Sequence, residues 1–462
     1  MSISDAQYSA WLSEDGADRV VLVELVHSAG TEYVASRPFI SEPTDTPANQ
    51  IYGDILATAI DLESRMDDMT AIGDVSVVND GSLAAWIGYN WRGHSIKCYL
   101  GAQDWSRDDF RLIVDAINGG MIAVESDRIK FDVLSAEHVL DEPLQADYLS
   151  DGYPIPVCFG EAFNVRPALY DTANHGYQVN DGAVTSVAAR DNGADLTETT
   201  DLSNGKFTLA SRPLGEVGVD VVESNDTVKE VVQWVCNAAG LTANTTLLDA
   251  LPTYKIGLYY DTPDATLADV MNDACNSIGA FWRIGATGEV EVYQIDEPAV
   301  TEDYTIVADD IIERGFRLVR IINPIATLTL NYKRNWNTHN RDSLAGIVAT
   351  DEDLAEDLST EWRRVTSANT VTDYPLAEDQ VLDTFLVSST DAQTEADRIA
   401  GLYDAPRKIW EVEAFLTPAE ALVGDTVKIT NPRHGFDGGV NCLVLARRHS
   451  PTRGRVTLEV MQ

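Results

Sequence analysis

The chain has 462 residues, of which 44% are hydrophobic, and its 74 acidic side chains against 33 lysines and arginines give a formal net charge of −41. This length predicts about three folded domains, and the acidic excess argues against binding to nucleic acid or to an anionic membrane surface. No stretch approaches the roughly 20 apolar residues of a membrane-spanning helix, and the acidic N-terminus lacks the features of a secretory signal. We therefore expect a protein that is made in a cytoplasm and has no membrane anchor.

The first 145 residues are expected to be mainly β. Strand-like patterns cover 19–26, 32–39, 74–80 and 94–101. Residues 56–66 are predicted to form a helix or a turn. Residues 108–135 predict two strands that are joined by a turn at Gly119-Gly120, because paired glycines favour tight turns.

The stretch DGYPIPVCFGEAFNVRPALYD (151–171) contains Pro154, Pro156 and Pro167 among strand-forming residues. Proline cannot donate to a β-ladder, so this stretch is predicted to be extended at a sheet edge or between domains. Short alternating strands follow at 177–181, 183–191, 206–211 and 218–224, with turns at Asp181-Gly182 and Asn192-Gly193. Such regular spacing is typical of a small barrel or sandwich.

Two helices and a hairpin follow. In the first helix one face carries Val228, Val231, Val232 and Val235; Asn225 or Asp226 is the predicted cap, and Gly240 the predicted end. The second helix carries Leu267, Val270, Met271, Ala274 and Ile278 and ends at Gly279. A hairpin is predicted over 280–295, turning at Gly285–Gly288. Helices that lead into a hairpin predict an α+β part.

The last third begins near residue 318. A strand is expected around 326–332, helix-like segments over 351–365 and 391–403, and closing strands over 408–416, 424–432, 441–449 and 454–462. The predicted fold is therefore mainly β with an α+β insertion, built from several small barrels or sandwiches. The predicted parts are an N-terminal β-rich domain (1–145), a β domain with the helix-hairpin part (146–317) and a C-terminal domain that closes in a β-barrel (318–462).

Residues that could perform chemistry show no catalytic spacing. The five cysteines form no C-x-x-C pair and are interpreted as buried apolar residues: Cys98, Cys158, Cys236, Cys275 and Cys442. The seven histidines lack metal-ligand spacing: His27, His94, His138, His175, His339, His434 and His449. No nucleophile elbow, phosphate-binding loop or metalloprotease motif occurs. We expect no enzyme activity and no cofactor.

Weaker alternatives stay open at this stage. Glu161 with Asp151, or Asp309 with Asp310, could form the carboxylate pair of a glycosidase, although solvated surface acids are the simpler interpretation. The acid-rich segment 191–201 could hold a structural divalent ion or form a plain hairpin turn. Three tryptophans could stack on sugars or anchor a core: Trp86, Trp91 and Trp105.

The order of these elements resembles a known family. Residues 151–171 followed by HGYQVNDGAVTSV and LSNGKFTLAS, then LADVMNDACNSIGAFW with WRIGATGEVEVY, NPIATLTLNY and ALVGDTVKITNPRHG, resemble siphophage tail-tip proteins of the baseplate hub type. These hub domains are shared with lambda-type tail tip attachment proteins and contractile-tail baseplate hubs. The resemblance covers roughly residues 150–462.

The resemblance implies a structural virion protein without catalysis. It implies a homotrimer that closes the tail tube, adapts a sixfold tube to a threefold tip and forms the DNA exit channel. Its implied partners are a distal tail protein, a tail tube or tape measure protein, and a central fibre or tip protein, with phage DNA passing through without specific binding. Its place would be the virion's tail tip. The alternatives are a hexameric distal-tail ring protein and a virion-associated carbohydrate or cell-wall hydrolase.

Overall fold

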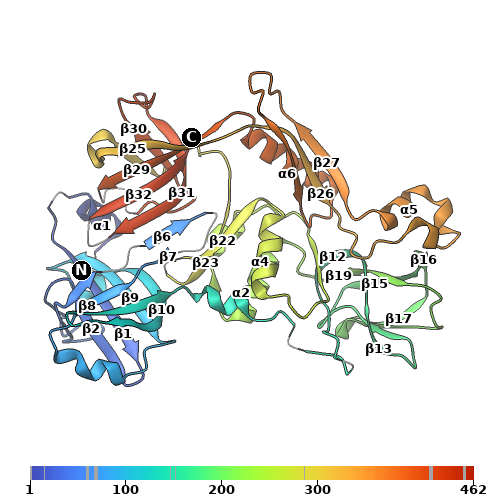
Figure 1. The fold of residues 1–462 in the computed structure, drawn as a ribbon, viewed down its shortest axis with the longest axis horizontal. Helices are drawn as coiled ribbons and strands as arrows, with labels where there is room; N and C mark the ends of the chain where they lie inside the picture. Colours follow the sequence, from blue (N-terminus) through green and yellow to red (C-terminus); the bar gives the residue numbers. More distant parts are fainter. Residues whose placement is uncertain are drawn as a thin grey trace.

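The computed structural model describes residues 3–14, 16–58, 62–66, 71–145, 147–150, 152–285, 287–415, 420–450 and 454–462. Within these ranges the chain forms 32 strands and six α-helices, so the predicted mainly β, multi-part fold with an α+β insertion is confirmed. Figure 1 shows the two ends of the chain in neighbouring parts of the molecule, with the helices α2 and α4 between them and the remaining strands.

The N-terminal part is a seven-stranded sheet in the order β2-β1-β9-β10-β11-β8-β5, here called the N-terminal sheet. Its strands are β1 (Arg19–His27), β2 (Gly30–Ala35), β5 (Leu56–Thr58), β8 (Val75–Val78), β9 (Ser95–Ala102), β10 (Arg111–Val124) and β11 (Arg128–Leu134). The other elements are α1 (Asp5–Leu12), β3 (Phe39–Ile40), β4 (Ile51–Tyr52), η1 (Ser82–Gly88), η2 (Arg107–Asp109) and η3 (Ala136–Asp141). Alternating side chains of β9, such as Ile96 and Cys98, are fully buried, as the sequence predicts.

Two expectations for this part are wrong. Residues 56–66 contain strands, because β5 pairs with β8 and β6 (Leu62–Arg65) pairs with a distant strand, β31, and with β7 (Ala71–Ile72). The Gly119-Gly120 pair is not a turn but lies inside β10. Gly120 has φ +104° at a register shift between β10 and β11, so the glycine permits a β-bulge and the strand continues to Val124.

The central part contains two sheets packed on one core. One is β16-β15-β19-β12-β21 and the other β13-β14-β18-β17. Their strands are β12 (Val157–Val165), β13 (Ala168–Asp171), β14 (Gly176–Gln178), β15 (Ser186–Asp191), β16 (Ala194–Asp195), β17 (Glu198–Asp201), β18 (Lys206–Leu209), β19 (Val217–Val222) and β21 (Gly257–Tyr260), with η4 (Leu202–Asn204). Val219 of the first sheet and Phe207 of the second share this core, which is therefore a small sandwich.

The α+β insertion contains α2 (Val228–Ala239), β20 (Thr242–Ala243), α3 (Thr245–Asp249), α4 (Leu267–Asn276) and the hairpin β22 (Ala280–Ile284) to β23 (Glu289–Gln294). The predicted valine face of α2 is fully buried, and Gly240 ends the helix with φ +68°. The predicted cap is wrong. Thr227 caps α2, because it forms a reciprocal capping box with Glu230, whereas Asp226 pairs with Lys255.

A three-stranded sheet, β27-β26-β28, lies against α6 (Ser389–Leu402). It contains β26 (Ile325–Tyr332), β27 (Arg363–Ala368) and β28 (Glu378–Asp383), and α5 (Glu352–Ser359) precedes β27 with η6 (Arg341–Ser343) and η7 (Val348–Thr350). The helix-like pattern of 351–365 therefore ends at Ser359. Ala392 and Ala396 of α6 and Leu328 of β26 belong to the same hydrophobic core as the buried faces of α2 and α4.

The last strands form the C-terminal sheet, in the order β24-β30-β31-β32-β29-β25. They are β24 (Tyr304–Val307), β25 (Ile311–Ile322), β29 (Arg407–Phe415), β30 (Thr426–Thr430), β31 (Val440–Ser450) and β32 (Arg455–Met461), with η5 (Ala308–Asp310) after β24. One hydrophobic cluster contains Val23 and Phe131 of the N-terminal sheet together with Val412 and Val460 of the C-terminal sheet. The two sheets therefore pack side by side, as Figure 1 shows.

Candidate assembly surfaces

The stretch 152–171 leads the chain into the middle of a sheet. Pro154 and Pro156 lie before the strand, but β12 is flanked by β19 and β21, so the prediction of an edge is wrong for residues 157–165. The prolines of the stretch lie outside β12, so they do not interrupt its backbone hydrogen bonds to β19 and β21. Gly160, with φ +62°, lets the strand approach the carbonyl of Ile256 so closely that a Cβ would lie 1.9 Å from that oxygen. The described part of this stretch therefore contributes strand pairing and close backbone packing.

The cysteines are unsuited to chemistry. All five are free and buried, and burial raises the pKa of each thiol, that of Cys236 to about 11 and that of Cys442 to about 12. Cys158 lies in the core of the sandwich. A buried, protonated thiol is a poor nucleophile, so these residues act as small apolar side chains.

Three of the four candidate carboxylates lie within the described residues: Glu161, Asp309 and Asp310. Glu161 is exposed beside a cavity of about 320 Å³ in which Asp226 pairs with Lys255, and its proposed partner Asp151 lies outside the described residues. Asp310 accepts a hydrogen bond of 2.8 Å from the backbone N–H of Val307, so it stabilises the turn after β24. Asp309 lies in the same short η5 turn.

The acids of segment 191–201 stabilise turns and ion pairs. Asp191 accepts hydrogen bonds from the backbone N–H groups of Leu214 and Gly215, both at 2.7 Å. Asp195 pairs with Arg190 at 3.3 Å. Asn192 and Gly193 have φ of 45° and 84°, the backbone of a tight hairpin turn. Among the described residues, no group of three His, Cys, Asp or Glu side chains is placed to hold a metal ion.

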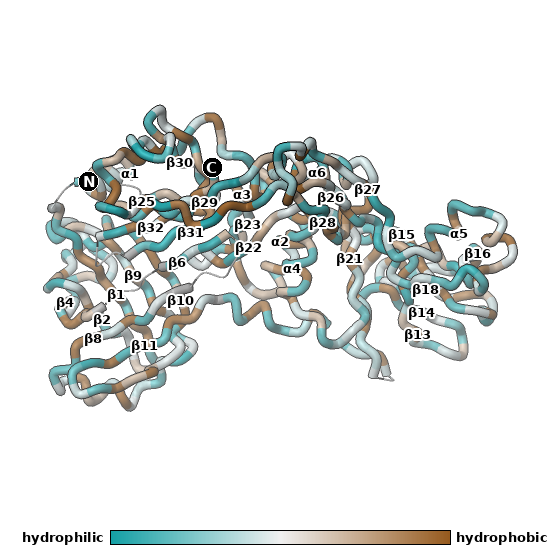
Figure 2. Tube along the Cα trace, turned by 45° about the horizontal axis from the view of Figure 1, so that its top comes forward, coloured by the Kyte–Doolittle hydropathy of each residue, from teal (hydrophilic) through white to brown (hydrophobic). Residues whose placement is uncertain are grey.

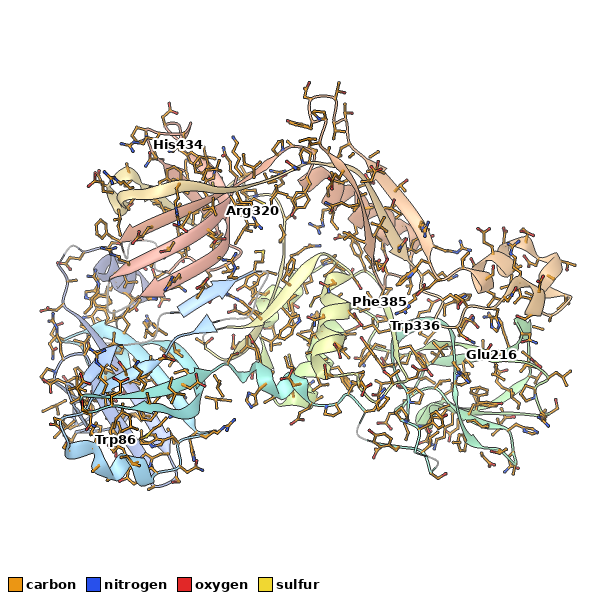
Figure 3. The ribbon with its side chains drawn as sticks, in the orientation of Figure 1. Trp86, Glu216, Arg320, Trp336, Phe385 and His434 are labelled. Carbon is orange, nitrogen blue, oxygen red and sulfur yellow. The ribbon has the colours of Figure 1, made fainter. Side chains whose placement is uncertain are left out.

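The tryptophans anchor the N-terminal core. Trp86 and Trp91 are buried, and the indole N–H of Trp91 donates to the carbonyl of Trp86 at 2.9 Å. Trp105 packs against Trp11 with ring centroids 4.6 Å apart. Figure 3 shows Trp86 within the N-terminal part. These rings are core anchors rather than a sugar-binding platform.

One exposed surface follows the outer edge of the C-terminal sheet. Within the described chain β25 pairs only with β29, so its other edge carries unpaired backbone groups. Residues 317–321 are all exposed, including Leu318, Val319 and Ile321, which are 43–51% accessible. We call residues 317–321 the basic edge, because Arg317 and Arg320 lie among these apolar side chains.

A second exposed surface is the outer edge of the three-stranded sheet. Within the described chain β28 pairs only with β26, and all six of its residues are exposed. We call Glu378–Asp383 the acidic edge: it carries Glu378, Asp379 and Asp383 beside Val381 and Leu382, which are 62% and 38% accessible. In the order β27-β26-β28, β28 lies on the opposite side of β26 from β27, and Figure 2 shows these strands next to α6.

Sequence reasoning missed both edges. The arginines of IIERGFRLVRII recur every three residues, at Arg314, Arg317 and Arg320, which obscures the two-residue alternation of a half-buried strand. EDQVLD resembles a polar loop. A strand that is exposed on both faces needs no alternation of apolar and polar residues, so the pattern used to find strands is missing from both edges.

Solved structures that align with this chain include three tail proteins. The 43 kDa tail protein of prophage MuSo2 from Shewanella oneidensis aligns at 9% identity over 96% of this chain and 98% of that one, with a TM-score of 0.46. The tail protein from Neisseria meningitidis MC58 aligns at 11% identity over 96% and 97%, with a TM-score of 0.46. The prophage tail protein gp18 from Listeria monocytogenes EGD-e aligns at 9% identity over 96% and 94%, with a TM-score of 0.45.

No protein-family model and no curated protein matches the sequence. Among the described helices, none is long and apolar enough to cross a membrane.

Proposed function

We propose that this chain is a structural protein of a phage tail, the hub at the tail tip of a long-tailed phage. Three copies would close the tail tube, join its sixfold end to a threefold tip and surround the path of the DNA. Neighbouring proteins would be a distal tail protein, a tail tube or tape measure protein, and a central fibre or tip protein. The place of action would be the virion, after assembly in the host cytoplasm.

The observation that carries this proposal is the packing of two β-sheet parts against each other within one chain. The N-terminal and C-terminal sheets share a hydrophobic cluster, and β6 pairs with β31 across almost 400 residues of sequence. Arg65 of β6 also donates two hydrogen bonds, of 3.0 and 3.1 Å, to Glu459 of β32, the strand next to β31. Three chains would thus present six sheet parts around one axis, which is how a threefold assembly can match a sixfold tube.

The order of elements supports the same proposal. The family that the sequence resembles has a β domain, then a helix with a hairpin, then a closing barrel, and this chain has α4 followed by β22 and β23, and then the C-terminal sheet. The candidate thiols are buried, and Asp310, Asp191 and Asp195 accept hydrogen bonds or form ion pairs within the fold. The three-part division at residues 145 and 317 stays part of the proposal.

Native mass spectrometry of the purified full chain tests the copy number. We expect three copies per particle, because closed rings are the usual result of heterologous contacts between identical chains. A particle of six copies would contradict the hub and favour the hexameric distal-tail ring. Release of soluble cell-wall fragments that is lost in a Glu161→Ala variant would instead favour the hydrolase.

The acidic composition adds a condition on the DNA path. Double-stranded DNA carries one negative charge per roughly 1.7 Å of its axis, so a basic lining would retain it and an acidic lining would let it slide. We therefore propose that acids outnumber lysines and arginines among the residues that face the channel. An arginine-lined bore in a map of the assembled tail tip would contradict this.

A further inference from the structure

The basic edge of β25 and the acidic edge of β28 are complementary, and neither has a partner strand on its outer side within the described chain. An unpaired edge is a template for another strand, and natural proteins usually cover it, shorten it or fill it with charge. Here each edge keeps apolar side chains exposed: Leu318, Val319 and Ile321 on one, and Val381 and Leu382 on the other. Both are therefore suited to burial against another strand.

Charge selects the partner. Residues 314–322 of β25 contain three arginines and no acid, whereas Glu378–Asp383 contains three acids and no base, in a chain whose formal net charge is −41. Arg317 already pairs with Glu411 of β29 at 2.7 Å, and Asp383 accepts a hydrogen bond from Asn331 at 2.6 Å. The complementarity therefore rests mainly on Arg320 and on Glu378 and Asp379. Like charges directly opposite each other destabilise a strand pair, and opposite charges stabilise it. Two basic edges or two acidic edges would therefore repel, while a basic edge and an acidic edge would attract.

The two edges of one chain cannot meet side by side. After β25 ends at Ile322, the chain continues into β26 at Ile325, and β28 runs parallel to β26 with Glu378 beside Ile325. The acidic edge thus begins beyond the end of the basic edge, beside the start of β26, and does not lie alongside β25. Figure 3 places Arg320 where β25 leaves the C-terminal sheet toward the sheet β27-β26-β28. The occupant of each edge must come from another molecule.

We infer that the basic edge of one copy pairs antiparallel with the acidic edge of a second copy. The antiparallel register that best matches the side chains opposes Arg317 and Asp383, Leu318 and Leu382, Val319 and Val381, and Arg320 and Gln380. Val319 stands at the β-bulge between Leu318 and Arg320, where it has no register partner on β29. Glu378 then lies diagonally from Arg320, within reach of its long side chain. A parallel register that opposes Arg317 and Glu378 would set Leu318 against Asp379 and Arg320 against Val381. It matches fewer side chains than the antiparallel register, in which Ile321 faces Asp379.

This contact rests on the proposed function and deepens it, because it names the strands that join neighbouring copies. Each copy would use its basic edge toward one neighbour and its acidic edge toward the other, a heterologous contact that closes into a ring. If two copies instead exchanged both edges with each other, the same strands would form a closed dimer. The covalent products of crosslinking distinguish the two arrangements.

Disulfide crosslinking of full-length chains tests the register. Val319→Cys and Val381→Cys, placed on two differently tagged chains that are expressed together, should form a disulfide between chains, since opposed residues have Cβ atoms about 4.5–5.5 Å apart. The natural cysteines are all buried and give little background. Leu214→Cys, at a residue that is 99% exposed, replaces Val381→Cys in the control and should not crosslink to Val319→Cys.

The chain that carries both Val319→Cys and Val381→Cys should give covalent trimers as its largest product. If native mass spectrometry shows trimers but the matched cysteines do not crosslink, the contact is wrong and the hub proposal stands. Covalent dimers without trimers would support the contact and contradict the ring of three. A chain that stays monomeric and forms no crosslink would contradict both.

A charge-exchange pair provides an independent measurement. Arg320→Glu should weaken self-association by about tenfold, because it places an acid opposite an acidic edge. Adding Gln380→Arg should restore the affinity, which a purely structural role of Arg320 would not allow. Arg212→Glu, which makes the same change at an exposed residue away from both edges, is the control and should leave the affinity unchanged. Equal affinities for all four proteins would overturn the inference.

Discussion

Several titratable side chains lie together at the contact between the N-terminal helix and the C-terminal sheet. Arg447 and His449 of β31 line a cavity of about 360 Å³ together with Tyr8 of α1 and Tyr304 of β24. Burial, with the nearby charge of Arg283, lowers the pKa of Arg447 to about 10. Burial, with the charge of Arg447, holds the pKa of His449 well below its usual value, so His449 is neutral in the folded protein.

This depressed pKa makes folding stability depend on pH. An unfolded histidine takes up a proton near pH 6.5, whereas buried His449 does not, so its contribution to stability is present above about pH 6.5 and is lost as the pH falls below that value. The variant His449→Gln cannot titrate. Its free energy of unfolding should therefore fall less than that of the wild type between about pH 7 and pH 5, measured by urea denaturation.

The control for His449 is His138→Gln, because His138 is exposed on η3. This variant removes an exposed histidine and measures the effect of the substitution itself. A slope for His449→Gln that equals the wild-type slope would show that His449 does not contribute.

Among the elements, β12 depends on close backbone packing at Gly160. It is a central strand, and Gly160 permits its contact with the carbonyl of Ile256. Gly240 at the end of α2 has a similar φ of +68°, but a Cβ there would meet nothing within 4 Å. Alanine substitutions at Gly160 and Gly240 therefore separate two losses in the free energy of unfolding: that of a left-handed backbone and that of a steric clash.

Gly240→Ala should reduce the free energy of unfolding by about 1–2 kcal/mol, the usual cost of a left-handed residue with a side chain. Gly160→Ala should cost at least about 2 kcal/mol more, because the new methyl group overlaps the carbonyl oxygen and the sheet must shift. Denaturant unfolding of both variants measures the difference. Equal losses would mean that the contact between β12 and Ile256 is looser than the structure shows.

At the scale of the whole molecule, α1 joins the first and last parts of the chain. Leu12 is 3% exposed and lines the same cavity as Leu100 of the N-terminal sheet and Leu422 before β30. Ser9 donates a hydrogen bond to Glu420 across this contact. The two sheets are therefore expected to be coupled in stability, whereas the sandwich around Phe207 has a separate core.

Leu12→Ala should destabilise both sheets together, with a loss of about 2–5 kcal/mol, because it leaves a cavity in a shared core. Hydrogen exchange should become faster in β9 and in β30, and the strands β18 and β19 of the sandwich serve as an internal control that should not change. Faster exchange in β9 alone would show that the two sheets are not coupled through α1.

Local sequence patterns were sufficient where one face of an element is buried. The valines of α2, the hairpin from Ala280 to Gln294 and the closing strands follow from their periodicity, since the buried face repeats at a fixed interval. Capping was less certain from sequence, because Asn225, Asp226 and Thr227 can all cap a helix. The choice of Thr227 depends on Glu230, three residues later, and on the ion pair that engages Asp226.

Long-range pairing was decided only by the tertiary structure. The strands β5 and β6 have no clear pattern of their own and form because β8 and β31 offer partners, and nothing local indicates that residues 62–65 lie beside residues 446–449. The basic and acidic edges escaped detection for the opposite reason: they are exposed on both faces, so no alternation marks them. The sequence by itself therefore determined which helices and strands have a buried face and which residues form that face. Only the folded chain determined which strands remain unpaired, because an edge exists only once every other strand has found its neighbour.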